Sequence, residues 1–244
     1  MSRAQKWRNC LMGSPSTIFF KREYSIKMEY LSKYDNEIQN DLKRTFPTSS
    51  FFTDHIVVLS DILNTYAYVN DGMGYAQGMA FIVFTLFKVY YEDDPIFATE
   101  DTFYSFHKVV QVIRPVYPLN AKDKKVLVFH QNLVPNVTLL LSKYNPTLAK
   151  RVNEIGIMDL LLYQNIPSLF CNKFEITDCC LLWDFILRKK HYDMFHRVLC
   201  VLAGMIISLE PVIMDFNIDS IMSIMQDQHT YNVRRVILHA HKVL

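Results

Sequence analysis

Two side chains in this sequence, Arg44 and Gln77, are suited to chemistry on a phosphoryl group. Arg44 belongs to the stretch Ile38-Gln-Asn-Asp41-Leu-Lys-Arg44-Thr-Phe-Pro47, in which positions 38, 41 and 44 step by three residues along an expected helix. Asp41 can therefore hold the guanidinium of Arg44 by a charge-assisted hydrogen bond. Pro47 ends the helix, so Arg44 projects from its last turn. The alternative is a surface ion pair that stabilises a helix end by roughly a few tenths of a kcal/mol.

Gln77 stands in a second stretch, Asp71-Gly-Met-Gly-Tyr75-Ala-Gln77-Gly78-Met, which holds three of the six glycines of the chain. Glycines this dense allow positive φ and close approach of another molecule, and the carboxamide offers both an acceptor and a donor. The stretch lacks the Gly-Lys-Ser/Thr of a phosphate-binding P-loop, and no strand is expected before it. The alternative interpretation is an ordinary turn between two helices with a solvated glutamine.

Taken together, the two stretches offer the groups that GTP hydrolysis by a small GTPase lacks or holds loosely. An arginine neutralises the charge that spreads over the transferring phosphoryl group, and a glutamine orients the attacking water. An arginine supplied by a second protein can raise the rate by roughly a thousandfold or more. The sequence therefore indicates Arg44 and Gln77 as candidate catalytic residues acting on a partner.

The stretches resemble the three signature motifs of the TBC domain family, the Rab GTPase-activating proteins, in order and in spacing. The matching segments are Arg3-x-x-x-Trp7, Ile38-x-x-Asp41-x-x-Arg44 and Tyr75-x-Gln77-Gly78. Leu169-Phe170 and Leu182-Trp183-Asp184 resemble the C-terminal half of the family, so the resemblance covers essentially the whole chain.

This resemblance implies that Arg44 matches an arginine finger and Gln77 a glutamine finger, both supplied to the partner. Asp41 and Tyr75 match positions that support the fingers, and Gly78 and Ile38 complete their motifs. Arg3 and Trp7 match the first motif, which we expect to serve structural packing. The expected partner is a GTP-bound Rab-family GTPase. That partner would bind GTP and Mg²⁺ itself, so we expect no cofactor in this chain.

Two other functions remain open at this stage. The first is a non-catalytic scaffold that has a TBC fold and holds a small GTPase without accelerating hydrolysis. The second is a helical adaptor whose motif matches arise by chance. A measurement of GTP hydrolysis across a panel of Rab proteins would separate the GTPase activator from both.

The composition narrows the class of protein. Half of the residues are apolar and the net charge is +2, with no concentrated basic face, so we expect no nucleic-acid partner. The longest apolar run, Val198 to Leu209, is too short to span a bilayer. The five cysteines lack zinc-ligand spacing, and we expect them to be reduced thiols in a cytoplasmic protein. A Rab partner, which the resemblance implies, would bring such a protein to endomembranes. His239 and His241 point to different sides of a helix, which argues against a metal site.

The periodicity of apolar residues predicts an all-α fold of many helices. The resemblance implies that residues 1–244 form a single TBC-type domain, with two helical lobes at approximately 1–116 and 117–244. We expect the lobe boundary within Pro115 to Asn120, a turn at Ser14-Pro15-Ser16, and a kink or break near Pro135. The helix from Met79 to Tyr91 is apolar nearly all round, which predicts a central position. The other expected helices cover residues 3–13, 28–45, 55–70, 102–113, 122–144, 146–156, 158–165, 177–189, 194–209, 220–226 and 231–242.

Overall fold

The computed structural model describes residues 1–23, 30–117, 124–188, 193–227 and 230–244, and within them the chain is all-helical with no strand. The first half forms α1 (Arg3–Leu11), α2 (Pro15–Glu23), α3 (Asp35–Leu42), α4 (Ser50–Asp54), α5 (Ile56–Val69), α6 (Met79–Asp93), α7 (Ala98–Ile113) and the 3₁₀ turn η1 (Arg114–Val116).

The second half continues with α8 (Lys124–Tyr144), α9 (Pro146–Ile155), α10 (Met158–Asn165), the 3₁₀ turn η2 (Ile166–Ser168), α11 (Ile176–Ile186), α12 (Met194–Ser208), α13 (Glu210–Asp215), α14 (Ile218–Gln226) and α15 (Val233–Val243). The all-α fold class expected from the sequence is confirmed.

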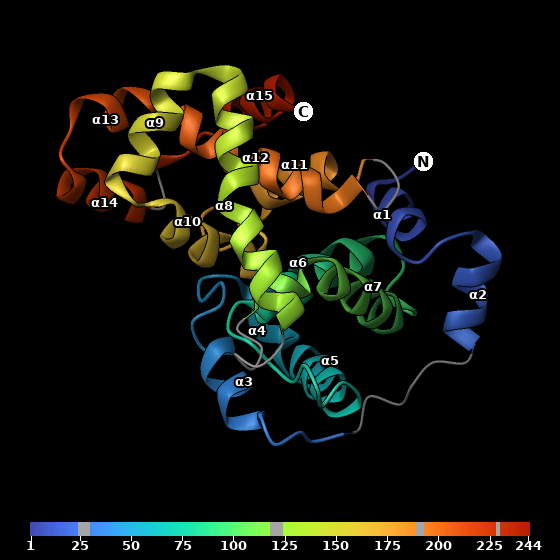
Figure 1. Ribbon diagram of the computed structural model, residues 1–244. Helices are drawn as coiled ribbons and strands as arrows, with labels where there is room; N and C mark the ends of the chain where they lie inside the picture. Colours follow the sequence, from blue (N-terminus) through green and yellow to red (C-terminus); the bar gives the residue numbers. More distant parts are fainter. Residues whose placement is uncertain (24–29, 118–123, 189–192, 228–229) are drawn as a thin grey trace.

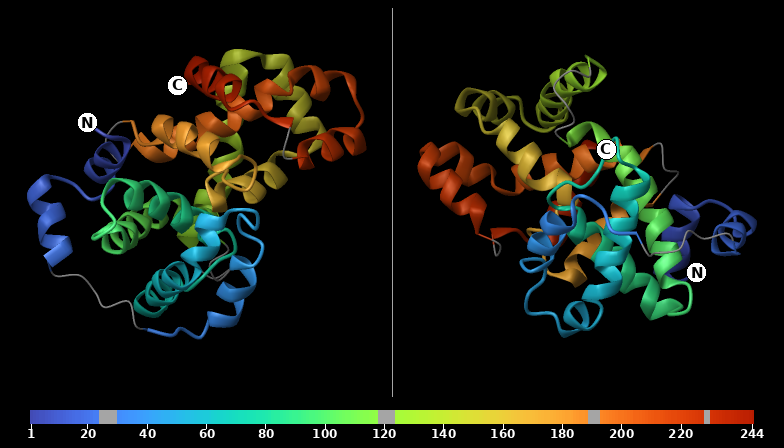
Figure 2. Two further views of the ribbon diagram at one scale, coloured as in Figure 1. Left: turned by 180° about the vertical axis from the view of Figure 1, so that it is seen from behind. Right: turned by 90° about the horizontal axis from the view of Figure 1, so that it is seen from below.

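The helices gather into two groups that follow the order of the chain. Helices α3 to α7 lie together at one end, and α9 with α12 to α15 lie together at the other (Figure 1). Helix α8 runs between the two groups, and α10 and α11 lie where they meet. The view from behind shows the same arrangement (Figure 2). The predicted boundary at Pro115–Asn120 extends into residues 118–123, which lie outside the described residues, so the two-lobe division at 116/117 stays a prediction.

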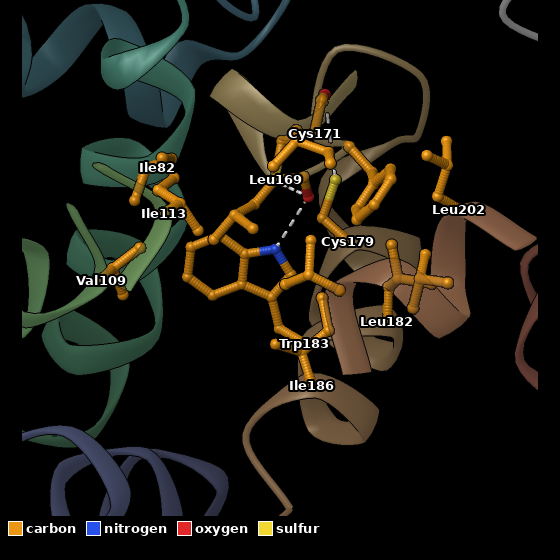
Figure 3. Close-up of a cluster of buried hydrophobic side chains, with 14 of the residues drawn as sticks. Ile82, Val109, Ile113, Leu169, Cys171, Cys179, Leu182, Trp183, Ile186 and Leu202 are labelled. Carbon is orange, nitrogen blue, oxygen red and sulfur yellow. Dashed lines mark hydrogen bonds between the residues drawn. The ribbon is translucent and has the colours of Figure 1, made fainter. Parts of the chain in front are cut away.

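Helix α6 occupies the centre, as its apolar sequence indicates. It contacts α1, α3, α5, α7 and α11, and ten of its side chains are buried. The Trp183 side chain of α11 points toward α6 and α7, where its ring lies near Ile82, Val109 and Ile113 (Figure 3). The Trp183 indole N–H donates to the Leu169 carbonyl oxygen at 3.2 Å, which satisfies a polar atom inside the core. The apolar packing therefore continues across both helix groups.

The predicted helix over residues 28–45 is too long. Within the described residues it begins only at Asp35, because Ser32 is held by a tertiary contact: its backbone N–H and its hydroxyl both donate to the Asn64 side chain, at 3.1 and 2.9 Å. At the other end the bonding tightens to i→i−3, from Arg44 N–H to the Asp41 carbonyl at 3.2 Å. Phe46 then takes a positive φ of 44°, so the chain leaves the helix before Pro47.

One further prediction about local structure is wrong, and another is wrong in part. Ser14-Pro15-Ser16 is the start of α2, because a proline at the first helical position needs no N–H partner. Helix α8 is not interrupted at Pro135, so the predicted break is wrong, whereas a kink there stays a prediction. A proline removes one hydrogen bond of a helix, and this helix retains its other turns and packs against α9 and α12. The short helices α4 and α13 were not expected either.

Several helix ends agree with the sequence signals. Asn145 caps α9 through its side chain, Pro146 occupies the first helical position, and Gly156 ends the helix at a φ of 68°. None of the five cysteines forms a disulfide, and four of them are buried. Within the described part of the chain, no helix is both long and apolar enough to cross a membrane.

Candidate functional site

Arg44 lies just past the end of α3, where the helix geometry fixes its backbone and leaves its side chain in solvent. The Thr45 hydroxyl donates to the Asp41 carbonyl at 2.8 Å and holds the last turn closed. The Arg44 side chain is 60% exposed, and its Nε–H donates to Asp41 Oδ1 at 3.2 Å. The guanidinium is therefore anchored at one nitrogen, while its two Nη groups have no bond to any described residue.

The loop that carries Gln77 depends on two of its glycines. Gly74 has a φ of 64°, and a Cβ atom there would lie 2.4 Å from the Tyr34 ring. Gly78 has a φ of 100°, and a Cβ atom there would lie 3.1 Å from backbone atoms of Pro167. Both positions therefore require the glycine backbone, and the close approach expected from the sequence is made by the chain itself. Gln77 between them is exposed, and its carboxamide forms no bond within the described part of the chain.

Asp41 joins the two stretches. Its carboxylate is 3% exposed, and Oδ2 accepts hydrogen bonds from the Tyr75 hydroxyl at 2.5 Å and from the Gly78 N–H at 3.0 Å. Burial, followed by the charge of Asp41, raises the pKa of the Tyr75 phenol well above its ordinary value, so the phenol stays protonated and donates. One carboxylate thus binds Arg44 on Oδ1 and the residue after Gln77 on Oδ2.

Arg44 and Gln77 line the same groove, whose volume is about 1030 Å³. Asp41, Tyr75 and Gly78 also line it, beneath the two exposed side chains. Ile38 is fully buried and anchors α3 in the core below. The structure thus brings together Arg44, Gln77 and three of the supporting residues, whereas their roles remain predictions.

The opposite side of the groove comes from the C-terminal half and was missed by sequence reasoning. This second wall consists of Tyr163, Gln164, Pro167, Asn172 and Lys173. Its shape is set locally: Asn172 Nδ2 donates to the Gln164 carbonyl at 2.9 Å, and Asn172 Oδ1 accepts from the Ser168 hydroxyl at 2.8 Å. Leu169-Phe170, which lies within this stretch, matched only the C-terminal half of the family, and nothing in the sequence places these positions beside Gln77. The hydroxyl of Tyr117 donates to the Pro167 carbonyl at 2.9 Å and ties the two walls together.

Arg3 and Trp7 lie outside the groove and bind one carboxylate of α11. Arg3 donates from Nη2 and Nε to Asp184 Oδ2 at 2.9 and 3.0 Å, and Trp7 Nε1 donates to Asp184 Oδ1 at 3.0 Å. The Trp7 ring, 1% exposed, lies 5.4 Å from the ring of Trp183. The two residues share one face of α1, and this face connects the first helix to the C-terminal half.

Among the described residues, no group of three or more His, Cys, Asp or Glu side chains could hold a metal ion. The groove itself offers one described arginine, one lysine and two carboxylates, Glu37 and Asp41, of which Asp41 already accepts hydrogen bonds from three donors. Its chemistry is that of hydrogen-bond donors and a positive charge presented outward.

A comparison with family models matches residues 2–214 to the Rab-GTPase-TBC domain. The chain belongs to the Rab-GTPase-TBC domain family. The match contains both walls of the groove and the Arg3–Trp7–Asp184 contact.

Comparison with curated proteins agrees with this family assignment. The TBC chain is 33% identical over 85 residues to the human Ecotropic viral integration site 5 protein homolog, a match that covers 33% of this chain and 10% of that protein. It is 35% identical over 80 residues to the Rab GTPase-activating protein eat-17 of Caenorhabditis elegans, covering 32% of this chain and 9% of that one. The chain thus spans about a tenth of the length of these curated relatives.

The fold of this TBC chain is similar to that of the Ypt/Rab-GAP domain of Gyp1p, with a TM-score of 0.76 and 16% sequence identity. The match covers 99% of this chain and 86% of the other. It confirms the TBC-type fold class, including its C-terminal helices.

Proposed function

We propose that this chain is a GTPase-activating domain that accelerates GTP hydrolysis by a Rab-family GTPase, with Arg44 and Gln77 inserted into the partner's active site. The observation that carries the proposal is the Asp41 carboxylate, which binds Arg44 and the Gly78 N–H at once and so presents both fingers in one groove. In an ordinary surface ion pair the aspartate would be solvated, whereas this one is buried under the loop.

Arg44 would supply the positive charge that the transition state needs. Its Nε–H is held by Asp41, so the planar fork of Nη1 and Nη2 points outward and can contact two phosphoryl oxygens together. Charge spreads over these oxygens as the γ-phosphoryl group transfers, and the guanidinium stabilises it there. The partner holds GTP and Mg²⁺, so this step requires no cofactor in the TBC chain.

Gln77 would position the attacking water. Its backbone is fixed on both sides, by Tyr75 bound to Asp41 and by Gly78 bound to the same oxygen. The free carboxamide can accept from the water through its oxygen and donate through its nitrogen. Gln77 would thus perform in trans what a glutamine of the GTPase itself performs in Ras.

The experiment that tests the proposal is single-turnover GTP hydrolysis on a panel of purified GTP-loaded Rab proteins. On a Rab that responds, Arg44→Lys keeps the charge but loses the fork, so its rate should fall nearly as far as that of Arg44→Ala, by about a hundredfold or more. Gln77→Ala should also lower the rate. Binding of the GTP-loaded Rab should change less than the rate in each variant. Lys43→Ala is the matched control, because Lys43 is an exposed neighbouring cation that does not line the groove.

The scaffold remains the second candidate, because the wide second wall could hold a GTPase without any chemistry. It predicts that Arg44→Ala and Gln77→Ala hydrolyse GTP at the wild-type rate while the complex still forms. That result on a Rab that binds would refute the two-finger mechanism and leave the scaffold.

A further inference from the structure

A second cavity lies on another part of the molecule, and the residues that line it lie in or next to α1, α11 and α15. Its volume is about 730 Å³, within the range typical of small-molecule sites. It shares no lining residue with the groove of Arg44 and Gln77. Its lining includes Lys6, Cys10, Leu181, Phe185, Arg188 and His241.

The charges around this cavity are unbalanced. Lys6, Arg188 and His241 line it, and Asp184 is the single acidic residue among the described residues of its lining. The Asp184 carboxylate is already bound by Arg3 and Trp7. Lys6 and Arg188 are exposed and form no ion pair within the described residues. The cavity therefore presents two cations with no anion left to meet them.

A third cation, Arg197, is buried behind the cavity wall. It is 4% exposed, its Nη1 donates to the Phe185 carbonyl at 3.2 Å, and its guanidinium lies 5.2 Å from the centre of the Phe185 ring. Its Nε has no partner in the described part of the chain, and no described carboxylate forms an ion pair with it. The contrast with Arg8 is informative: Arg8 is buried to the same degree, 5% exposed, and is bound by Asp93 and Asp101. A buried guanidinium without a carboxylate is costly unless an anion reaches it.

The positive charge of Arg197 extends to the cavity itself. It acts on Cys10 and on His241, both of which line the cavity. Burial, followed by the charges of Arg188 and Arg197, lowers the pKa of His241. The lining residues and the nearby charge of Arg197 together make the electrostatic potential in this cavity positive.

We propose that the cavity between α1, α11 and α15 binds a phosphate monoester, with Lys6, Arg188 and the charge of Arg197 meeting the phosphate and Leu181 and Phe185 contacting the organic part. A phosphate monoester carries close to two negative charges near neutral pH and offers three acceptor oxygens, which matches several cations around one site. Because Leu181 and Phe185 give the cavity an apolar side, we expect a ligand that also has an organic part, rather than inorganic phosphate alone. A free phosphate ester and a lipid headgroup share this chemistry. The site is independent of the proposed Rab groove.

The probes are inositol 1,4-bisphosphate in solution and phosphatidylcholine vesicles that contain phosphatidylinositol 4-phosphate, with pure phosphatidylcholine vesicles as the reference. Titration calorimetry measures the first, and co-sedimentation measures the second. Saturable binding of the soluble ester assigns a soluble ligand. Binding only to the doped vesicles assigns a lipid headgroup. Absence of binding to both probes overturns the proposal.

Three variants locate the binding. Lys6→Gln and Arg188→Gln should each weaken binding by about tenfold, because each removes a charge-assisted contact at an exposed position that carries little packing. Arg235→Gln is the matched control, since Arg235 is an exposed arginine of α15 that does not line the cavity, and it should bind like the wild type. Equal weakening by all three variants would reveal unspecific attraction to a basic surface and would contradict the site.

Arg197→Met tests the buried cation separately. Without ligand this variant should melt no lower than the wild type, because it replaces an unpaired buried charge by an apolar side chain of similar length. It should also bind the probe at least about tenfold more weakly. Bound phosphate should raise the pKa of His241, which proton NMR of the imidazole follows. Wild-type affinity of Arg197→Met, or an unchanged His241 titration in the bound state, would overturn the assignment.

Discussion

The substitution Asp41→Asn tests whether one carboxylate organises both fingers. Asparagine has the shape of aspartate, and its single carbonyl oxygen can still accept from the Tyr75 hydroxyl and the Gly78 N–H on the buried side. Its amide nitrogen then faces Arg44 Nε, where the carboxylate had Oδ1. Two donors cannot bond each other, so the variant should release Arg44 while the loop keeps its contacts.

The expected loss of stability follows from the same contacts. Two hydrogen bonds to a buried carboxylate become bonds to a neutral oxygen, and each weakens by about 1 kcal/mol. The pair with Arg44 adds little, because the arginine is 60% exposed and solvent screens it. The free energy of unfolding should therefore fall by about 2 kcal/mol, or roughly 4–8 °C in thermal midpoint for a chain of this size. Denaturant titration measures it, with Asp54→Asn as the control, because Asp54 is exposed and its side chain forms no hydrogen bond among the described residues.

The catalytic effect should be larger than the loss of stability and should depend on Arg44. In single-turnover hydrolysis on a responsive Rab, Asp41→Asn should lower the rate on the order of ten- to hundredfold, because Arg44 loses its anchor. In an Arg44→Ala background the same substitution should cost less than about threefold, since the interaction it removes is already gone. Rate losses that multiply independently in the double variant would refute the reasoning.

Three further predictions concern residues that stabilise the fold. Trp7→Ala should lower the free energy of unfolding by about 3–5 kcal/mol, measured by denaturant titration, because it removes a fully buried ring and a hydrogen bond to Asp184. Gly78→Ala should destabilise the chain and slow single-turnover hydrolysis, because the residue takes a φ of 100° and a Cβ would lie 3.1 Å from backbone of the second wall. The hydrogen bond from Arg8, then the charges of Arg8 and Arg22, hold the pKa of Asp93 below its ordinary 3.8, against the effect of burial. The stability it adds is present above pH 3.8 and lost as the pH falls through the lower folded value, so acid titration of Asp93→Asn should show a weaker loss there.

Much of the fold could be predicted because its signals are local. The bounds of α5, α6 and α10 agree with the sequence within two residues, and α6 in particular is marked by a run that is apolar nearly all round. The residues before α3 could not be predicted, because Ser32 is held by Asn64, which lies 32 residues away. The apolar residues around Ser32 have helical spacing, but the tertiary hydrogen bonds from Ser32 to Asn64 override the local preference for a helix.

The candidate site divides in the same way. Arg44 and Gln77 stand in short stretches whose residue types indicate their chemistry, and the structure places both in one groove. The second wall carries no such pattern, since Tyr163 and Lys173 are ordinary residues brought there by η2 packing against Gly78. The acceptor for Arg3 and Trp7 was equally hidden, because Asp184 lies 181 residues from Arg3 and only the folded chain joins them.

The groove and the first motif share one arrangement, in which a single carboxylate accepts hydrogen bonds from donors on separate segments of the chain. Asp184 binds Arg3 and Trp7, and Asp41 binds Arg44, Tyr75 and the backbone beside Gln77. The difference lies in what remains exposed. A free arginine side chain loses up to about 2 kcal/mol of rotamer entropy when it is ordered. In the mechanism we propose, part of that ordering is complete at Asp41 before a partner binds, so more of the binding free energy would be available at the transition state. The proposed finger would then depend on its buried anchor as much as on its exposed tip.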